Sequence, residues 1–180
     1  SNNVSVGYGS LSENTTGSLN VAVGYESLND NTTASSGTAV GFQSLSKVTE
    51  GNYNTGFGAH AGGALTTGSS NTALGYAALY LKTTGSQNVA VGPWAMQNGT
   101  TGDYNVAVGR YALKNATGNF NVGIGSTAGQ DITSGAKNVV VGGDSDVSAA
   151  TAQNQIVIGS ETTGQADNSV TLGNADVTAI

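Results

Sequence analysis

Candidate chemistry begins with His60, the single histidine of this 180-residue chain. A histidine acts as a catalytic base or a zinc ligand only beside a nucleophile or further ligands. The chain has no second histidine and no cysteine, and His60 stands at a repeat position that Glu26, Gln43 and Ala77 fill elsewhere. We therefore predict that His60 is a solvent-facing turn residue, that the chain has no catalytic residues, and that it is not an enzyme.

Two other patterns superficially resemble ligand-binding motifs. Glycines cluster over residues 56–62 and 123–129, but phosphate-binding loops need a helix after them, and the sequence has no helical signal. Asp131, Asp144 and Asp146 offer oxygen ligands for calcium, yet the Gly-Gly-x-Gly-x-Asp phrase of calcium-binding solenoids is absent. We predict no cofactor and no metal site, and we interpret these carboxylates as ordinary surface groups.

Aromatic residues recur at two places in the sequence pattern. They follow a glycine or precede an asparagine, at Tyr8, Tyr25, Phe42, Tyr76, Tyr53, Tyr104 and Phe120. Exposed rows of such rings can stack on cell-surface sugars, and they can equally cover turn backbones and stack between repeats. Trp94, which follows the only proline, interrupts this pattern. It is our one candidate for a specialised surface contact.

The charge balance excludes several classes of partner. The formal net charge is −6, and the five basic residues are scattered, whereas nucleic-acid binding needs clustered Lys and Arg. No apolar run approaches the roughly 18 residues of a membrane span. We therefore predict neither nucleic-acid binding nor membrane insertion. The Asn-x-Thr sequons at Asn14, Asn31, Asn98 and Asn115 belong to the repeat itself and imply glycosylation only in a secreted parent protein.

All of these residues lie on one repeat that organises the whole chain. The phrase at residues 71–79, Asn-Thr-Ala-Leu-Gly-Tyr-Ala-Ala-Leu, recurs in variant form at 20–28 and 105–113. The glycine in it, which we predict to be a structural turn residue, recurs at Gly7, Gly24, Gly41, Gly58, Gly75, Gly92, Gly109, Gly125, Gly142, Gly159 and Gly173. Eight of the ten intervals are 17 residues, one is 16 and the last is 14. A short fixed period predicts a solenoid in which each repeat is one coil.

Each repeat is numbered here from its asparagine, as positions one to five. Position two is Val, Thr or Ile, position three is mostly Ala or Gly, position four is large and apolar, and position five is the glycine. This β-branched run predicts a short strand. A later apolar position, occupied by Leu28 and Leu79, predicts a second short strand, and the Gly of a Thr-Thr-Gly corner is expected to supply a positive φ.

Stacking such coils about 4.8 Å apart predicts an all-β, parallel β-solenoid or β-roll of about ten 17-residue coils. The position-one asparagines are then expected to bond from coil to coil as a ladder. Two coils replace the leucine by Gly62 or Gly129 and place Leu65 or Ile132 three residues later. We expect these substitutes to fill the same interior slot.

The regular pattern ends after Gly142. We expect residues 1–142 to form regular coils and residues 143–180 to form irregular terminal coils that lead to a following domain absent from this chain. The sequence also opens inside a repeat without an initiator methionine. We therefore interpret it as a segment of a longer protein.

In each predicted strand, positions two and four point to one face and position three points to the other. Both faces lack charged residues. Strands apolar on both faces are normally buried on both. A single coil covers only one face, so side-by-side self-association is expected. The position-four residues predicted to lie in the core or in this interface are Val23, Val40, Phe57, Leu74, Val91, Val108, Ile124 and Val141.

The phrases Asn-Val-Ala-Val-Gly and Asn-Thr-Ala-Leu-Gly resemble the head repeat of trimeric autotransporter adhesins. The longer form, with Gly-Tyr-x-Ala-Leu and Thr-Thr-Gly, resembles repeats of phage tail fibres and large bacterial surface proteins. The resemblance implies a left-handed β-roll and a parallel homotrimer. It also makes residues 154–174 similar to the segment that precedes a C-terminal intramolecular chaperone in such fibres.

The resemblance implies a non-enzymatic structural or adhesive fibre segment, extracellular, on a virion tail or a bacterial cell surface. Its expected partners are itself, as a parallel homotrimer, and a cell-surface glycan or protein receptor. A self-assembling extracellular filament is an alternative, since uncapped coils expose sheet edges. Ice binding by a threonine array ranks last, because adjacent threonines point to opposite faces and leave one outward per coil.

Overall fold

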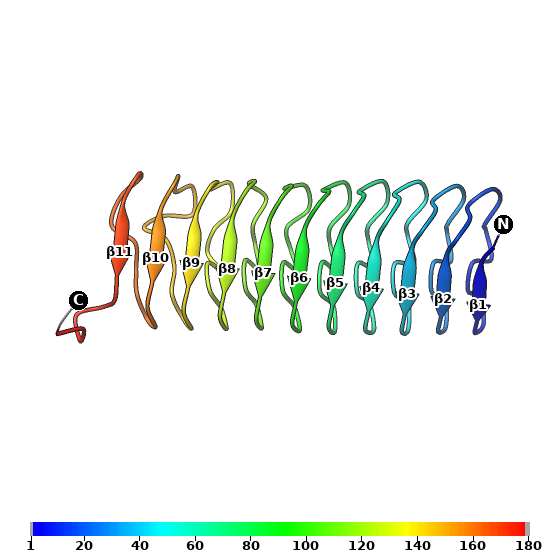
Figure 1. The fold of residues 1–180 in the computed structure, drawn as a ribbon, viewed down its shortest axis with the longest axis horizontal. Helices are drawn as coiled ribbons and strands as arrows, with labels where there is room; N and C mark the ends of the chain where they lie inside the picture. The colour runs from blue at the N-terminus through cyan, green and yellow to red at the C-terminus, as the bar shows by residue number, and fades with distance from the viewer. Residues whose placement is uncertain (1, 179–180) are drawn as a thin grey trace.

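The computed structural model of the chain describes residues 2–178 and forms a rod of stacked coils with the termini at opposite ends (Figure 1). Each coil contributes one three-residue strand. The strands are β1 (Val4–Val6), β2 (Val21–Val23), β3 (Thr38–Val40), β4 (Thr55–Phe57), β5 (Thr72–Leu74), β6 (Val89–Val91), β7 (Val106–Val108), β8 (Val122–Ile124), β9 (Val139–Val141), β10 (Ile156–Ile158) and β11 (Val170–Leu172).

The strands form one parallel sheet in chain order. Equivalent repeat positions pair directly, so that Val21 lies opposite Thr38 and Ala22 opposite Ala39. The prediction of a parallel β-solenoid with coils of about 17 residues is confirmed. The sheet also continues from β9 through β10 to β11, so the coils after Gly142 extend the same rod.

Position three of each strand points into the rod and positions two and four point out. Ala22, Ala90 and Ala107 have no exposed surface. Small residues fit there because leucines from the opposite wall of the coil, Leu28 and Leu79 among them, are themselves fully buried against them. The interior of each coil is thus one small strand residue and one large residue facing it.

The expected second strand is wrong. The segment that carries the leucines, called the return leg here (residues 25–30 and their equivalents), contains no strand anywhere in residues 2–178. Its leucines have a left-handed backbone, with φ of 47° at Leu28 and 54° at Leu79. The Leu28 N–H donates to the Ser44 carbonyl of the next coil at 3.1 Å, so the leg stacks through turns. Left-handed backbone costs about 1–2 kcal/mol per residue, which burying a leucine side chain (about 1.5–3 kcal/mol) offsets.

The role predicted for the Thr-Thr-Gly glycine is also wrong. Gly17, Gly68 and Gly85 do not have a positive φ. They are glycines because coils approach closely there: a Cβ on Gly68 would lie 2.2 Å from the Gly85 carbonyl oxygen, and one on Gly17 would lie 2.3 Å from the Ala34 carbonyl oxygen. The left-handed residue of this corner is instead the one before each asparagine, such as Leu19 (φ 60°).

The predicted asparagine ladder is confirmed. The backbone N–H of Asn71 donates to Oδ1 of Asn54 at 2.9 Å, and the N–H of Asn88 donates to Oδ1 of Asn71 at 3.0 Å. Each Nδ2 also closes its own coil, as when Asn71 donates to the Gly85 carbonyl at 2.9 Å. These side chains are buried, so the ladder satisfies polar groups that would otherwise be costly.

The variant and terminal coils keep the interior filled by other means. Leu65 and Ile132 are fully buried, which confirms that they replace the missing leucines. After β9 no leucine faces the strand; Val140, Val147 and Val157 fill the interior instead. A larger residue at position three thus accompanies the loss of the leucine opposite.

Candidate interaction surfaces

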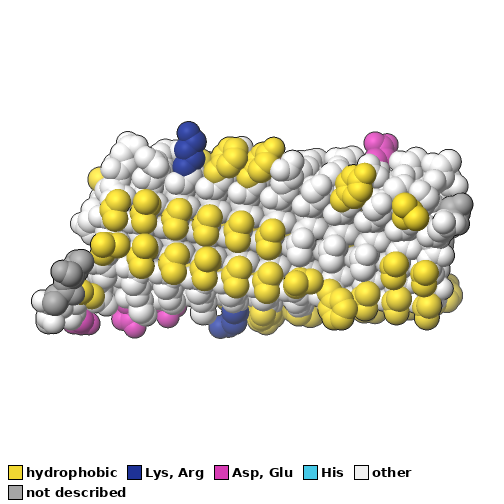
Figure 2. Space-filling model, viewed as in Figure 1, with side chains coloured by type: hydrophobic (Ala, Val, Ile, Leu, Met, Phe, Trp, Pro, Cys, Tyr) yellow, Lys and Arg dark blue, Asp and Glu magenta, His cyan; other side chains and the backbone are white. Residues whose placement is uncertain are grey.

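The outer face of the sheet carries an apolar stripe, defined here as the side chains at positions two and four of β1–β11. Figure 2 shows it as two rows of hydrophobic side chains along the strands, interrupted in one row where β3, β4 and β5 have threonine. No stripe residue is charged. The stripe runs the length of the sheet, and one chain leaves it open to solvent.

The eight predicted core-or-interface residues all lie in this stripe. Phe57 is 58% exposed and Ile124 is 41% exposed, while Val23 and Val91 are partly covered by their neighbours in the sheet. The sequence was compatible with two locations for these residues, the core and an interface. The structure places them outside the coil's own core, which position three and the leucines fill.

The eleven turn glycines end the strands with a conformation other residues rarely adopt. Their φ angles are all positive, from 74° at Gly173 to 144° at Gly142. Space is short as well: a Cβ on Gly75 would lie 2.8 Å from the carbonyl carbon of Gly92 in the next coil. Both the backbone angle and the close stacking therefore require glycine here.

Just beyond these glycines, rings from seven coils stack along the rod in an aromatic ladder, made up of Tyr8, Tyr25, Phe42, His60, Tyr76, Trp94 and Tyr111. Tyr8 and Tyr25 are parallel with ring centroids 5.4 Å apart, and His60 meets Phe42 edge-on at 5.2 Å. A shorter stack pairs Tyr104 with Phe120 at 4.9 Å at the other end of the strands. Of the two roles open for the aromatics, stacking between coils is thus observed.

Trp94, the candidate surface contact, belongs to this ladder. Its ring stacks on Tyr111 with centroids 5.0 Å apart and meets Tyr76 edge-on at 5.5 Å. The Arg110 guanidinium lies 5.7 Å from the Trp94 ring centre and 4.5 Å from that of Tyr111. The ladder therefore ends in a cationic cap, in which ring faces attract the positive charge.

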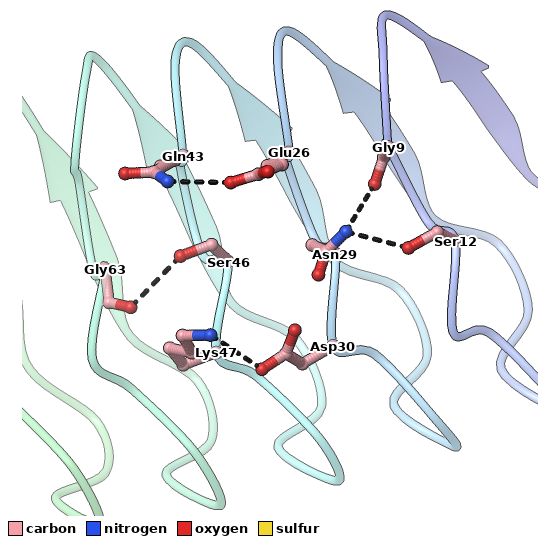
Figure 3. Close-up of polar contacts among 9 residues, drawn as sticks. All are labelled: Gly9, Ser12, Glu26, Asn29, Asp30, Gln43, Ser46, Lys47 and Gly63. Carbon is pink, nitrogen blue, oxygen red and sulfur yellow. Dashed lines mark hydrogen bonds and ion pairs between the residues drawn. The ribbon is translucent and has the colours of Figure 1, made fainter.

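Glu26 affects the neighbouring ring of the ladder. Its side-chain hydrogen bond and its negative charge raise the pKa of the Tyr25 phenol above its ordinary value. The Glu26 carboxylate also accepts a hydrogen bond from Nε2 of Gln43 at 2.7 Å (Figure 3). The exposed turn is therefore linked from coil to coil by polar contacts as well as by rings.

His60 lies in a turn, as predicted, with φ of 59°, but its ring is half-buried among aromatic rings. It meets Tyr80 edge-on with centroids 5.7 Å apart. Among residues 2–178 no side chain or carbonyl forms a hydrogen bond with either ring nitrogen. Beside it is a hollow of about 220 Å³ lined by Gln43, Ser46, Lys47, His60, Gly63, Ala64, Tyr80 and Leu81, called the Gly63 hollow below.

Two of the three aspartates considered for calcium have carboxylates that accept hydrogen bonds from the protein. Asp144 accepts a hydrogen bond from the Thr127 hydroxyl at 2.6 Å, and Asp146 accepts from the Asp131 and Val147 N–H groups. Burial raises the pKa of Asp146, which these two hydrogen bonds partly oppose. In the described part of the chain, no three His, Cys, Asp or Glu side chains come together to hold a metal ion.

The burial of Lys82 was not among the predictions made from the sequence. Its side chain is completely covered, and Nζ donates a hydrogen bond to the Gly102 carbonyl. Burial lowers the pKa of the Lys82 ammonium to about 8, against a smaller opposing effect of the Asp103 carboxylate. Its repeat position holds Leu65 one coil earlier, and that correspondence was the only available hint that the site faces inward.

The corner threonines form one outward row, as the sequence predicted. The first threonine of four of these pairs, Thr15, Thr32, Thr66 and Thr83, bonds to the next coil, as when Thr66 Oγ1 donates to the Thr83 carbonyl at 3.0 Å. The second, such as Thr67, is exposed. The outward row is therefore incomplete, because Thr49, Thr117 and Thr133 are not followed by a second threonine.

Comparisons with protein-family models, curated proteins and solved structures found no match. Within residues 2–178 no helix is long and apolar enough to cross a bilayer. The case for function therefore depends on the surfaces described above.

Proposed function

We propose that this chain is a non-enzymatic segment of an extracellular fibre, in which three copies associate in parallel through their apolar stripes. The rod then holds or presents attachment sites away from a virion tail or a bacterial cell surface. The likeness of its repeats to trimeric autotransporter adhesins and phage tail fibres supports the number three and a left-handed coil. The observation that carries the proposal is the uncharged stripe along the whole sheet.

A stripe of this kind favours association of parallel copies in register. Its side chains repeat once per coil, so a neighbouring rod of the same sequence presents matching rows at the same spacing. Large contiguous apolar patches on a soluble surface usually mark an interaction site. A rotational axis along the rod closes the assembly, and stiffness and several attachment points then add avidity without new contacts.

Sedimentation velocity of the purified chain tests this directly. The expected species has three times the 17.7 kDa chain mass at micromolar concentrations. The double variant Val91→Asp with Val108→Asp places two charges in the stripe and is expected to sediment as a monomer with an unchanged far-UV spectrum. Leu81→Asp, at an exposed leucine on the return leg, is the control and should remain trimeric.

Other outcomes would contradict the proposal. A wild-type chain that is monomeric across the concentration range would remove the role of the stripe. A series of ever larger species in the sedimentation profile would favour the end-to-end filament. Loss of trimers in Leu81→Asp as well would show that association uses another wall of the coil.

A further inference from the structure

The Gly63 hollow exists because one coil has a glycine and an alanine where the neighbouring coils have larger side chains. Gly63 occupies a return-leg column that holds Asn29, Ser46 and Tyr80 in neighbouring coils. The adjacent column holds Asp30, Lys47 and Leu81 in the neighbouring coils and Ala64 in the coil of Gly63. The coils before and after therefore form walls around a floor of glycine and alanine.

The size of the hollow suits one small ring. The walls belong to coils two steps apart, about 10 Å at the usual spacing of paired strands. The volume of about 220 Å³ lies below the usual range for drug-sized ligands. A single six-membered ring with its substituents fits this space, and an extended ligand would have to continue outside it.

One wall is an aromatic ring held in place. Tyr80 is 36% exposed, and its ring lies so close to Gly63 that a Cβ there would be 3.2 Å from Tyr80 Cδ2. The His60 and Tyr80 rings meet in a T-shaped arrangement with centroids 5.7 Å apart. Aromatic rings fixed in this way offer a flat apolar face to a C–H-rich ligand surface such as that of a sugar ring.

The other side presents polar atoms without partners. Gln43 donates its Nε2 to Glu26, which leaves its carboxamide oxygen directed away from Glu26 (Figure 3). The His60 ring nitrogens make no hydrogen bond within residues 2–178. A carboxamide oxygen and an imidazole can together accept from and donate to vicinal hydroxyl groups.

The nearby charges are already balanced. Lys47 Nζ pairs with Asp30 at 3.0 Å, and Figure 3 shows that it reaches back toward the preceding coil, away from Gly63. Ser46 likewise donates its hydroxyl to the Gly63 carbonyl at 3.3 Å. Among the described residues that line the hollow, the one lysine is paired with Asp30, so the site favours a neutral ligand over an anionic one.

We propose that the Gly63 hollow is a subsite for one neutral pyranose residue of a glycan, packed on Tyr80 and hydrogen-bonded by Gln43 and His60. This subsite would be one of the attachment sites of the fibre, so the inference rests on the proposed function. It lies on the return leg, a different wall from the apolar stripe, so a trimer formed through the stripe leaves its residues outside the interface proposed above.

Saturation-transfer NMR on the full chain tests the proposal, with methyl glucoside, methyl galactoside and methyl mannoside as neutral probes and methyl glucuronide as the anionic probe. At least one neutral probe is expected to receive saturation. Tyr80→Ala removes the aromatic wall, and Gly63→Asn fills the hollow with the residue type of Asn29. Tyr80→Ala should weaken binding roughly tenfold, the usual scale for one stacking contact. Gly63→Asn should also weaken binding, because its side chain takes up space beside the Tyr80 ring.

Tyr104→Ala removes an exposed ring from a stack elsewhere and is the matched control, expected to bind like the wild type. No saturation of any neutral probe, undiminished saturation in Tyr80→Ala, or stronger binding of the glucuronide would each overturn the proposal. Sedimentation of the same samples separates the two hypotheses. A monomer that binds sugar refutes only the trimer, and a trimer that binds none refutes only the subsite.

Discussion

The two faces of a single strand differ more than the sequence suggests. In β6, Ala90 points inward and has no exposed surface, whereas Val91, the next residue, points outward and is partly covered. Apolarity is greater on the outside: valines face solvent while alanine faces the core. In most sheets with one solvated face the order is the reverse.

This inversion teaches that the coil and its assembly are stabilised by different residues. The interior is filled from the return leg, where Leu79 and Met96 are fully buried, so the strand needs only a small inner residue. Its large residues are then free for contacts outside the chain. Folding and association should therefore be separable by mutation, one residue apart.

The largest expected effect comes from placing a charge on each face in turn. Ala90→Asp buries an unpaired carboxylate and should cost more than about 3 kcal/mol, enough to abolish cooperative unfolding in a thermal melt followed by circular dichroism. Val91→Asp should keep the spectrum and lose self-association. Ala90→Gly, a residue found at this column in Gly56 and Gly123, is the control and should cost about 1 kcal/mol. Equal loss of structure in both Asp variants would contradict the separation of the faces.

The turn that ends the strand can be broken next. Gly75→Val introduces a side chain at φ of 128° and within 2.8 Å of a backbone carbon. Strain of about 1–3 kcal/mol from the backbone, with added cost from the contact, should lower the melting temperature. Gly143→Val is the matched control, because a Cβ there would meet nothing within 4 Å. Similar melting temperatures for the two variants would count against a required positive φ.

Much of the fold was predictable because the same residue pattern recurs in each repeat. The period fixed the stacking, and the asparagine column and the shift from Gly62 to Leu65 followed from what a stacked core needs. The backbone of the return leg was not predictable in this way. An apolar residue flanked by polar ones is typical of a strand, and nothing in the identity of Leu28 or Leu79 marks a left-handed φ.

The surfaces were less predictable because they depend on departures from the repeat. The stripe could be proposed from the uncharged strand, but its orientation required knowing that the leucines fill the interior. The Gly63 hollow arises because Gly63 and Ala64 are smaller than the residues at the same positions of the neighbouring coils, a difference that only the comparison between coils reveals. Lys82 is buried in a column where its neighbour is Leu65, and charge alone predicts exposure.

Lys82 allows the interior of the coil to be compared with its surface by titration, because it is the one Lys or Arg that is fully buried among the residues described. With its pKa lowered to about 8, the unfolded chain binds more protons than the folded chain between pH 8 and the ordinary lysine value near 10.5. Stability due to Lys82 should therefore rise with pH across that window, by up to about 3 kcal/mol. It should be constant well below pH 8.

Chemical denaturation at several pH values, compared with Lys82→Met, isolates this contribution from that of the tyrosines. The unfolding free energy of the wild type should rise relative to that of Lys82→Met as the pH increases from 8 to about 10.5. Lys47→Met, at an exposed lysine paired with Asp30, is the control for removing a lysine charge from the surface. A pH-independent difference for Lys82→Met would mean that the buried amine titrates normally.

The smallest expected effect comes from a substitution that fills a gap in the asparagine ladder. Gly37 replaces the asparagine of its coil, so no Oδ1 stands opposite the backbone N–H of Asn54, as Asn54 Oδ1 does for Asn71. A Cβ on Gly37 would lie 3.1 Å from Asn20 Oδ1, in a column where other coils hold asparagine. Gly37→Asn should therefore stabilise the chain by about 1–2 kcal/mol, through one hydrogen bond and a less flexible unfolded state. Gly37→Ala restores only the second contribution, so an asparagine variant whose melting temperature does not exceed that of the alanine variant would show that the ladder gains nothing from continuity.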